Sequence, residues 1–287
     1  MSEVLVSAAD AAQMMSTQPV VVIDTRNPDA YAAGHIPGAV NMHEIFTYLA
    51  TSTPEGIEEL KAKFAQAFGA AGLSGAQTAL VYEQSMNSGF GQSCRGYYLL
   101  SVLGYREAKV LHGGFDAWTS ASLPVSTEAA SPSPATCPVD LAGASILIDA
   151  QAMLAALDNP DIAILDVRDV DEWIGDSSSP YGKEFCPRKG RIPGARWLEW
   201  YRMMKPTAEG PRFKAKEEIL AECATVGITV DTPVYLYCFK GARASNTFVA
   251  LKNAGVKDVR MYFGSWNEWS RDPAFPVESG SPFPKAA

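Results

Sequence analysis

The chain has 287 residues, 47% of them hydrophobic, which suits one large domain or two ordinary ones with buried cores. Its 24 basic and 32 acidic residues give a net charge of -8, which argues against a nucleic-acid binder, since such proteins usually carry a basic excess. We find no secretory signal at the N-terminus and no apolar stretch near the ~18 residues that a membrane helix needs. Five scattered cysteines without a CxxC pair predict neither a disulfide framework nor a metal site, so we expect no cofactor and a reducing, cytoplasmic compartment.

The segments of the first half recur in the same order in the second half. Five pairs correspond: 20–26 with 162–168, 34–39 with 190–195, 78–82 with 233–237, 97–104 with 247–255, and 109–118 with 259–269. The first pair consists of apolar runs that end in Asp-x-Arg, and the second pair reads Gly-x-Ile-Pro-Gly-Ala. A repeat of this length indicates two copies of one domain.

Within each copy, short β-branched apolar runs alternate with helix-like segments. This pattern predicts an α/β fold, in which a mostly parallel sheet is flanked by helices. Residues 127–142 are rich in Pro, Ser, Ala and Thr, a composition typical of linkers. We therefore expect one domain at 1–126, a linker at 127–142 and a second domain at 143–287. Ligands of such sheets bind beyond the carboxyl ends of the strands, which points to the loops after residues 82 and 237.

The loop after residue 237 carries a cysteine, a glycine and two basic residues. Cys238 ends the apolar run, Lys240, Gly241 and Arg243 follow, and a helix is expected to begin near residue 244 or 245. The helix N-terminus and the two cations favour a thiolate, which is the nucleophilic form of cysteine. Backbone N–H groups of residues 239–243 are expected to converge on the sulfur. A buried structural cysteine is the plainer alternative, and the basic residues in the same loop weigh against it.

The segment from Cys238 to Arg243 resembles the active-site loop of the rhodanese family. The Asp-x-Arg runs, the Gly-x-Ile-Pro-Gly-Ala turns and Gly-Ser-Trp-x-Glu-Trp at 264–269 match the family as well, so the resemblance covers nearly the whole chain. It implies two tandem rhodanese-like domains and a sulfurtransferase in which Cys238 carries a persulfide. The implied partners are a small anionic sulfur donor such as thiosulfate and a thiol or cyanide acceptor, with no nucleic acid or membrane. The oligomeric state stays open.

The resemblance also implies which copy is active and which residues meet the substrate. Glu83 stands at the cysteine position of the first copy and cannot become a persulfide, so that copy is expected to be silent. Cys94 further along is either a structural thiol or one activated at a helix start. The implied substrate contacts come from the residues between the cysteine and the end of its loop: Phe239, Lys240, Gly241, Ala242 and Arg243. Lys240 matches the lysine that faces the anion in thiosulfate-using relatives. For Arg243 the alternative, which we favour slightly, is a structural role, in which its guanidinium fork holds loop carbonyls or a carboxylate.

One position departs from the family pattern. Thiosulfate-using tandem enzymes carry an arginine four residues after the Asp-x-Arg arginine, and this chain has Glu172 there. The basic segment 185–191 either replaces the missing charge, through Arg188, Lys189 or Arg191, or is a solvated loop. Of these three we place Arg191 in the predicted substrate site. The serine-rich insertion at 177–179 is expected to form a lid or a long surface loop.

Three other functions compete with this hypothesis. Dual-specificity phosphatases of related fold need five residues between cysteine and arginine, and only four lie between Cys238 and Arg243, which disfavours a phosphatase. A second alternative has 3-mercaptopyruvate as the donor, although that branch usually has a Cys-Gly-Ser-Gly type of loop. A non-catalytic module that binds or senses sulfur is the remaining alternative.

Overall fold

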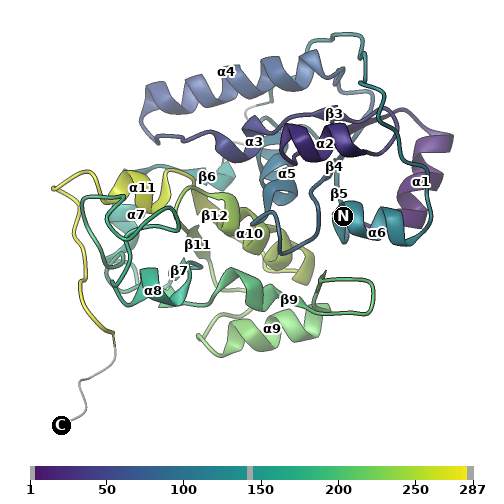
Figure 1. The fold of residues 1–287 in the computed structure, drawn as a ribbon. Helices are drawn as coiled ribbons and strands as arrows, with labels where there is room; N and C mark the ends of the chain where they lie inside the picture. Colours follow the sequence, from purple (N-terminus) through teal and green to yellow (C-terminus); the bar gives the residue numbers. More distant parts are fainter. Residues whose placement is uncertain (1–3, 141–144, 283–287) are drawn as a thin grey trace. The chain divides into compact units, whose positions relative to one another are not determined.

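The computed structural model describes residues 4–140 and 145–282. The chain divides into two compact units (Figure 1): the first contains residues 1–48, 58–146 and 204–214, and the second contains residues 49–57, 147–203 and 215–287. Segments 49–57 and 204–214 are thus grouped with the unit built mainly from the other copy. The internal repeat does not predict this grouping.

The first unit is built on a five-stranded parallel sheet with the order β1-β5-β4-β2-β3. Its strands are β1 (Leu5–Val6), β2 (Val20–Asp24), β3 (Val40–Asn41), β4 (Thr78–Tyr82) and β5 (Ala108–Leu111). Its helices are α1 (Ala8–Thr17), α2 (Pro28–Ala33), α3 (Glu44–Thr47), α4 (Pro54–Ala70, whose start is grouped with the second unit), α5 (Gln92–Val102) and α6 (Gly114–Ser120). An antiparallel pair, β9 (Met204–Lys205) and β10 (Arg212–Phe213), completes the unit.

The second unit repeats this topology, with the order β6-β12-β11-β7-β8 and all neighbours parallel. Its strands are β6 (Leu147–Ile148), β7 (Ala163–Asp166), β8 (Arg196–Trp197), β11 (Val234–Tyr237) and β12 (Val259–Tyr262). Its helices are α7 (Ala150–Ala156), α8 (Val170–Trp173), the 3₁₀ helix η2 (Trp200–Met203), α9 (Lys216–Ala224), α10 (Ala242–Ala254) and α11 (Ser265–Trp269). The predicted class, parallel sheets flanked by helices in two tandem copies, is confirmed.

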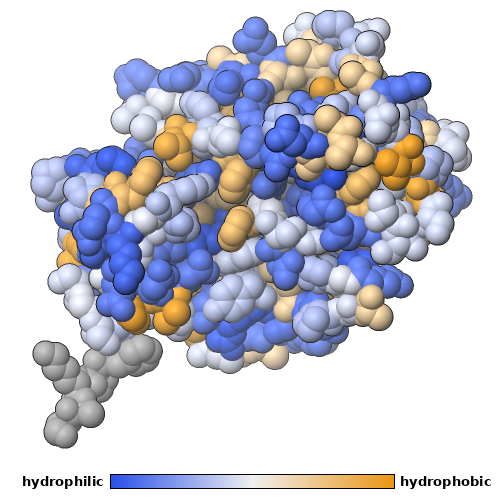
Figure 2. All heavy atoms as spheres, in the orientation of Figure 1, coloured by the Kyte–Doolittle hydropathy of each residue, from blue (hydrophilic) through white to orange (hydrophobic). Residues whose placement is uncertain are grey.

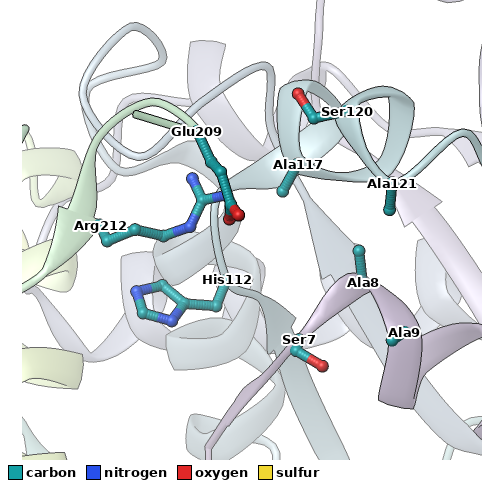
Figure 3. Close-up of a pocket in the computed structure, with 9 residues that line it drawn as sticks. All are labelled: Ser7, Ala8, Ala9, His112, Ala117, Ser120, Ala121, Glu209 and Arg212. Atoms are coloured by element: carbon teal, nitrogen blue, oxygen red, sulfur yellow. The ribbon is translucent and has the colours of Figure 1, made fainter. Parts of the chain in front are cut away.

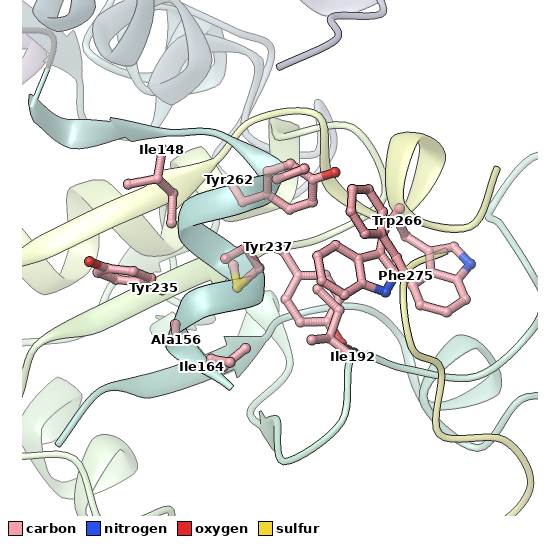
Figure 4. Packing of buried hydrophobic residues seen from close by; sticks show 12 residues of the cluster. Ile148, Ala156, Ile164, Ile192, Tyr235, Tyr237, Tyr262, Trp266 and Phe275 are labelled. Carbon is pink, nitrogen blue, oxygen red and sulfur yellow. Dashed lines mark hydrogen bonds between the residues drawn. The ribbon is translucent and has the colours of Figure 1, made fainter. Parts of the chain in front are cut away.

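Helices cover both faces of each sheet, which explains why the central strands are apolar without alternation. Every residue of β11 is buried, as is every residue of β4. On one face of the second sheet, residues of α7 and α11 pack against the strands in a cluster that includes Tyr237, Tyr262, Trp266 and Trp269 (Figure 4). Helices α9 and α10 lie together, and α10 contacts β11 and β12 with its almost wholly buried residues. This packing fixes the end of β11, where the loop with Cys238 begins.

No helix within residues 4–140 and 145–282 is long and apolar enough to cross a membrane. The face drawn in Figure 2 is largely hydrophilic, with apolar residues scattered among polar ones. Single exposed apolar side chains are normal on a folded domain and need no partner to explain them.

Candidate active site

Cys238 follows β11 directly and lies at the carboxyl end of the central strand of its sheet. Strand β11 pairs with β7 on one side and β12 on the other, and Tyr237 stands opposite Asp166. The Cys238 side chain is buried, with 1% of its surface exposed. The sulfur therefore sits where open parallel sheets bind their ligands.

Two carbonyl groups of the loop point toward α11. The Cys238 carbonyl accepts a hydrogen bond from the Trp266 N–H over 3.0 Å, and the Phe239 carbonyl accepts one from the Asn267 N–H over 2.9 Å. In a trans peptide, the N–H points opposite to the C=O of the same unit. The peptide N–H groups of residues 239 and 240 are thereby directed away from α11.

Gly241 directs its own N–H group onto the sulfur. Its N–H donates to Cys238 Sγ over 3.1 Å, and its φ of +87° lies in the left-handed region that favours glycine. A Cβ at this position would come within 2.8 Å of the Phe263 ring. Helix α10 begins at Ala242, two or three residues before the start expected from sequence, because the turn at Gly241 already completes the loop. The N-terminus of α10 lies beside the sulfur-bearing loop.

Arg243, in the first turn of α10, forms a buried ion pair with two carboxylates next to helix α8. Its Nη1 lies 2.6 Å from Glu172 Oε2 and 2.9 Å from Asp169 Oδ2, and its Nη2 lies 3.0 Å from Glu172 Oε1. Glu172 is 1% exposed and faces Arg243 with both oxygens. Of the structural roles considered for Arg243, holding a carboxylate is the one observed.

The electrostatic state of Arg243 follows from these partners. Burial by itself lowers the pKa of Arg243, but the Glu172 carboxylate, the Cys238 sulfur and Asp169 together hold that pKa above its ordinary value. Arg243 is therefore charged, and Cys238 lies within its electrostatic reach. Glu172, which departs from the family pattern, is the main counter-charge of this arginine.

Two aromatic residues from the segment that follows the insertion at 177–179 pack on the loop. The Phe239 ring meets the Tyr181 and Phe185 rings edge to face, with centroids 5.4 and 5.8 Å apart. The Lys240 ammonium lies 5.0 Å above the centre of the Tyr181 ring, a distance typical of a cation–π contact. Tyr181 and Phe185 are about half exposed, whereas Phe239 and Lys240 are buried. Tyr181 and Phe185 thus form the outer layer over part of the loop.

The basic segment 185–191 is engaged elsewhere. Arg191 hydrogen-bonds to the carbonyls of Trp173 and Gly280 and forms an ion pair with Glu278. Arg188 donates to carbonyl oxygens of the C-terminal segment: Ser270, Phe275, Trp269 and Asp272. Lys189 pairs with the exposed Glu184. These contacts favour an anchoring role for Arg191 over the substrate contact predicted from sequence, and they do not replace the charge missing at Glu172.

In the first unit, Glu83 occupies the position that corresponds to Cys238. Its carbonyl accepts from the Phe115 N–H of α6, just as the Cys238 carbonyl accepts from α11. The Glu83 side chain is fully buried and accepts a hydrogen bond from the Ser93 hydroxyl over 2.8 Å. Burial raises the pKa of Glu83 to about 7, although Ser93 and neighbouring backbone N–H groups oppose the shift. Burial and the charge of Glu83 also hold the pKa of Cys94 well above its ordinary value, which favours a structural thiol.

A separate cavity of about 270 Å³ lies in the first unit, at the end of β5 (Figure 3). Among its lining residues, Arg212 lies 3.5 Å from Glu209, and His112 Nε2 accepts a hydrogen bond from the Phe213 N–H over 2.9 Å. Burial and Arg212 lower the pKa of His112 to about 4. No cysteine lines this cavity, and within the described ranges we find no cluster of metal-ligating side chains.

Sequence reasoning missed several residues that surround the cysteine. Asp169 follows Arg168 directly, and its position one residue after the Asp-x-Arg motif was the only signal for it. Tyr181 and Phe185 follow the insertion at 177–179, and the repeat does not indicate the course of this segment. The Ser265 hydroxyl accepts a hydrogen bond from the Cys238 N–H over 3.3 Å, and Ser265 itself has a φ of +55°. All of these contacts depend on tertiary packing.

Comparisons with known proteins agree with this architecture. The model of the rhodanese-like domain matches residues 7–121 and 149–272, so the chain belongs to the rhodanese family. It is 30% identical over 278 residues to a thiosulfate sulfurtransferase of Azotobacter vinelandii, with 96% of each chain covered. A thiosulfate sulfurtransferase of Pseudomonas aeruginosa is 28% identical, again with 96% of each covered, and the sulfur carrier protein TtuD of Thermus thermophilus is 27% identical, with 87% of each covered.

Solved structures of similar fold include EanB. A structure of EanB in a cysteine-persulfide form with ergothioneine is 26% identical to this chain, with a TM-score of 0.82, and the match covers 98% of this chain and 71% of EanB.

Proposed function

We propose that the protein transfers a sulfane sulfur from thiosulfate to cyanide or a thiol through a persulfide on Cys238. The observation that carries this proposal is the loop geometry, in which Cys238 Sγ accepts the Gly241 N–H at the start of α10. Relatives named thiosulfate sulfurtransferase, similar over the full length, support the donor. A relative captured with a cysteine persulfide supports the intermediate.

The reaction has two displacement steps at sulfur. The Cys238 thiolate attacks the outer sulfur of thiosulfate, the S–S bond of thiosulfate breaks, and sulfite departs with the bonding electron pair. A cyanide ion or a thiolate then attacks the outer sulfur of the persulfide, which releases thiocyanate or a new persulfide and restores the Cys238 thiolate. Neither step consumes a proton, an oxidant or a cofactor.

The chain's own groups would assist both steps. N–H groups of residues 239–241 and the N-terminus of α10 stabilise negative charge on the outer sulfur, because they are fixed before the reaction begins. We assign Lys240 to the departing sulfite, since its side chain belongs to the same loop. Phe239, Gly241 and Ala242 shape the loop, and Arg243 holds the start of α10 to Glu172 and Asp169.

In this proposal the first unit is silent. Glu83 takes the place of the nucleophile, and a carboxylate cannot carry a sulfane sulfur. All five cysteines are free of disulfides, which supports action in a reducing compartment.

The deciding experiment is thiocyanate formation from thiosulfate and cyanide by the wild type and by Cys238→Ser. We expect turnover that disappears with Cys238, and a gain of about one sulfur mass on the wild-type Cys238 peptide after donor treatment. Sulfur uptake without turnover would support a binding module instead. Turnover with 3-mercaptopyruvate but not with thiosulfate would replace the donor.

A further inference from the structure

The charge that faces Cys238 is set by a group outside its loop. Arg243 and Lys240 are the cations of the loop, and Arg243 is engaged by Glu172 through both guanidinium ends and by Asp169 through one. Among these four side chains the formal charges cancel. A dianion brought to the sulfur gains less attraction here than it would beside an uncompensated arginine.

Glu172 holds its position through the local structure of α8. It is the third residue of the helix, and its Oε2 also accepts the Asp169 N–H over 3.4 Å in a capping-box arrangement. Both carboxylates therefore sit at one helix start and meet one guanidinium. Because Glu172 is 1% exposed, water screens its charge poorly.

We infer that Glu172 is a specificity-determining residue, which limits the negative charge that a sulfur donor can bring to Cys238. The inference rests on the proposed function and deepens it. Thiosulfate, a dianion, is held below the rate that the loop would otherwise allow, whereas organic persulfides, R–S–S⁻, which carry one negative charge at the reacting group, lose less of their rate to Glu172. In the transfer from a persulfide, the Cys238 thiolate attacks the terminal sulfur, the donor S–S bond breaks, and R–S⁻ leaves with the electron pair.

Two alkylating reagents measure the charge effect without any turnover. Iodoacetate and iodoacetamide react with a thiolate in the same way and differ by one negative charge. The ratio of their rates at the Cys238 peptide, followed by mass spectrometry, therefore reports the local potential, and changes in thiolate population cancel. We expect Glu172→Gln to raise the iodoacetate-to-iodoacetamide ratio by roughly threefold to tenfold, because Arg243 loses its main counter-charge.

Thiosulfate turnover then gives a quantitative check. A potential that speeds a monoanion by some factor should speed a dianion by about the square of that factor. In Glu172→Gln, the thiosulfate kcat/KM, normalised to the iodoacetamide rate, should therefore rise by about the square of the factor seen with iodoacetate. Added salt should lower this kcat/KM more steeply in the variant than in the wild type. A change of packing alone has no reason to produce this relation between the two anions.

Matched variants complete the test. Asp258→Asn also removes a carboxylate paired with an arginine, Arg260, but Asp258 precedes β12 and so lies at the opposite end of the sheet. It should leave the alkylation ratio within about twofold, since exposed charges at such a distance are screened. Asp169 is partly exposed and pairs with the same guanidinium. Asp169→Asn should therefore raise the iodoacetate-to-iodoacetamide ratio at least about twofold. This variant replaces Glu172→Gln as the test of the inference if Glu172→Gln does not fold.

An unchanged alkylation ratio in folded Glu172→Gln, or in Asp169→Asn if the first variant does not fold, overturns the inference. If the wild type forms no thiocyanate from thiosulfate and cyanide, the proposed donor is wrong, but the alkylation result remains valid. The two failures are therefore distinguishable.

Discussion

Tyr237, the last residue of β11, donates a hydrogen bond from its phenol to the Asp166 carboxylate over 2.6 Å. The same phenol oxygen accepts the Ile192 N–H over 3.2 Å, and Asp166 also pairs with Arg168. All of these polar groups are buried, so each depends on the others for its hydrogen bonds. The network ties β7, the turn before β8 and the residue that precedes Cys238 into one arrangement.

We expect Tyr237→Phe to lower the free energy of unfolding by roughly 1–3 kcal/mol, because the Ile192 N–H and one Asp166 oxygen lose a buried partner. Thiocyanate formation should fall several-fold, since a small displacement of a reacting group is costly. Chemical denaturation and the turnover assay measure the two effects.

The first unit supplies the matched control for this change. Tyr82 donates to Asp24 and accepts the Ile36 N–H, in the same arrangement as Tyr237. Tyr82→Phe should destabilise the protein by a similar amount and leave turnover unchanged. Equal loss of activity in both variants would contradict the proposal that only the second unit carries the reaction.

Gly241→Ala tests the turn that brings an N–H onto the sulfur. The substitution forces a Cβ into the left-handed region and toward the Phe263 ring, at 2.8 Å. We expect a loss of about 2–4 kcal/mol of stability, together with most of the activity. Gly194→Ala is the control, because Gly194 has a φ of +72° but its Cβ would meet nothing within 4 Å. If thermal unfolding shows equal losses for both, the contact with Phe263 is unimportant.

The sequence predicted the parts of this site that lie close together along the chain. The apolar run of β11, Cys238 and Gly241 form one continuous segment, and the order of strands and helices indicated a parallel sheet. The Asp-x-Arg motif also makes a local contact, because Asp166 and Arg168 are two residues apart and form a buried ion pair. Local spacing was enough in each case.

Partners that come from distant segments were not predictable. Arg243 is 71 residues from Glu172, and nothing in a single sequence indicates that the two side chains meet. Arg191 likewise meets a distant partner, since it pairs with Glu278, 87 residues away, although its substrate contact stays a prediction. The grouping of segments 49–57 and 204–214 with the other unit is equally invisible in the repeat.

Lys240→Ala tests the assignment of the loop cation to sulfite departure. We expect the thiosulfate kcat/KM to fall by roughly tenfold to a hundredfold, because a nearby cation stabilises the developing dianion. The rate at which iodoacetamide alkylates Cys238 should fall much less, because that reaction releases no sulfite. Lys189→Ala removes a lysine that pairs with exposed Glu184 and should change neither rate. Full thiosulfate activity in Lys240→Ala would remove Lys240 from the mechanism.

Tyr181→Ala tests whether the Tyr181 side chain shields the cysteine. Tyr181 packs on Phe239 and lies under the Lys240 ammonium, so its removal should expose the loop. We expect iodoacetamide to label Cys238 several times faster in this variant. Tyr201→Ala is the control, because Tyr201 is similarly exposed and packs on Trp200. Equal labelling rates in the two variants would show that Tyr181 does not restrict the access of iodoacetamide to Cys238.

The buried carboxyl of Glu83 makes the stability of the first unit depend on pH. Its pKa is raised from 4.5 to about 7, so the folded protein holds this proton more tightly than the unfolded chain does. The resulting stabilisation is fully present below pH 4.5 and is lost as the pH rises through about 7. The difference corresponds to roughly 3 kcal/mol. His112, with its lowered pKa, changes stability in the opposite direction, so the effect must be measured as a difference between variants.

Glu83→Gln provides that difference, because glutamine has no proton to lose. The unfolding free energy of the wild type, relative to Glu83→Gln, should decrease steadily from pH 5 to pH 8 by about 2–3 kcal/mol, as measured by denaturant titration at each pH. Turnover at Cys238 should be the same in both proteins, since Glu83 only fills the position of the first unit that corresponds to Cys238. Parallel pH profiles would mean that Glu83 is ionised in the folded protein at neutral pH, with its charge satisfied by Ser93 and the backbone N–H groups at the start of α5.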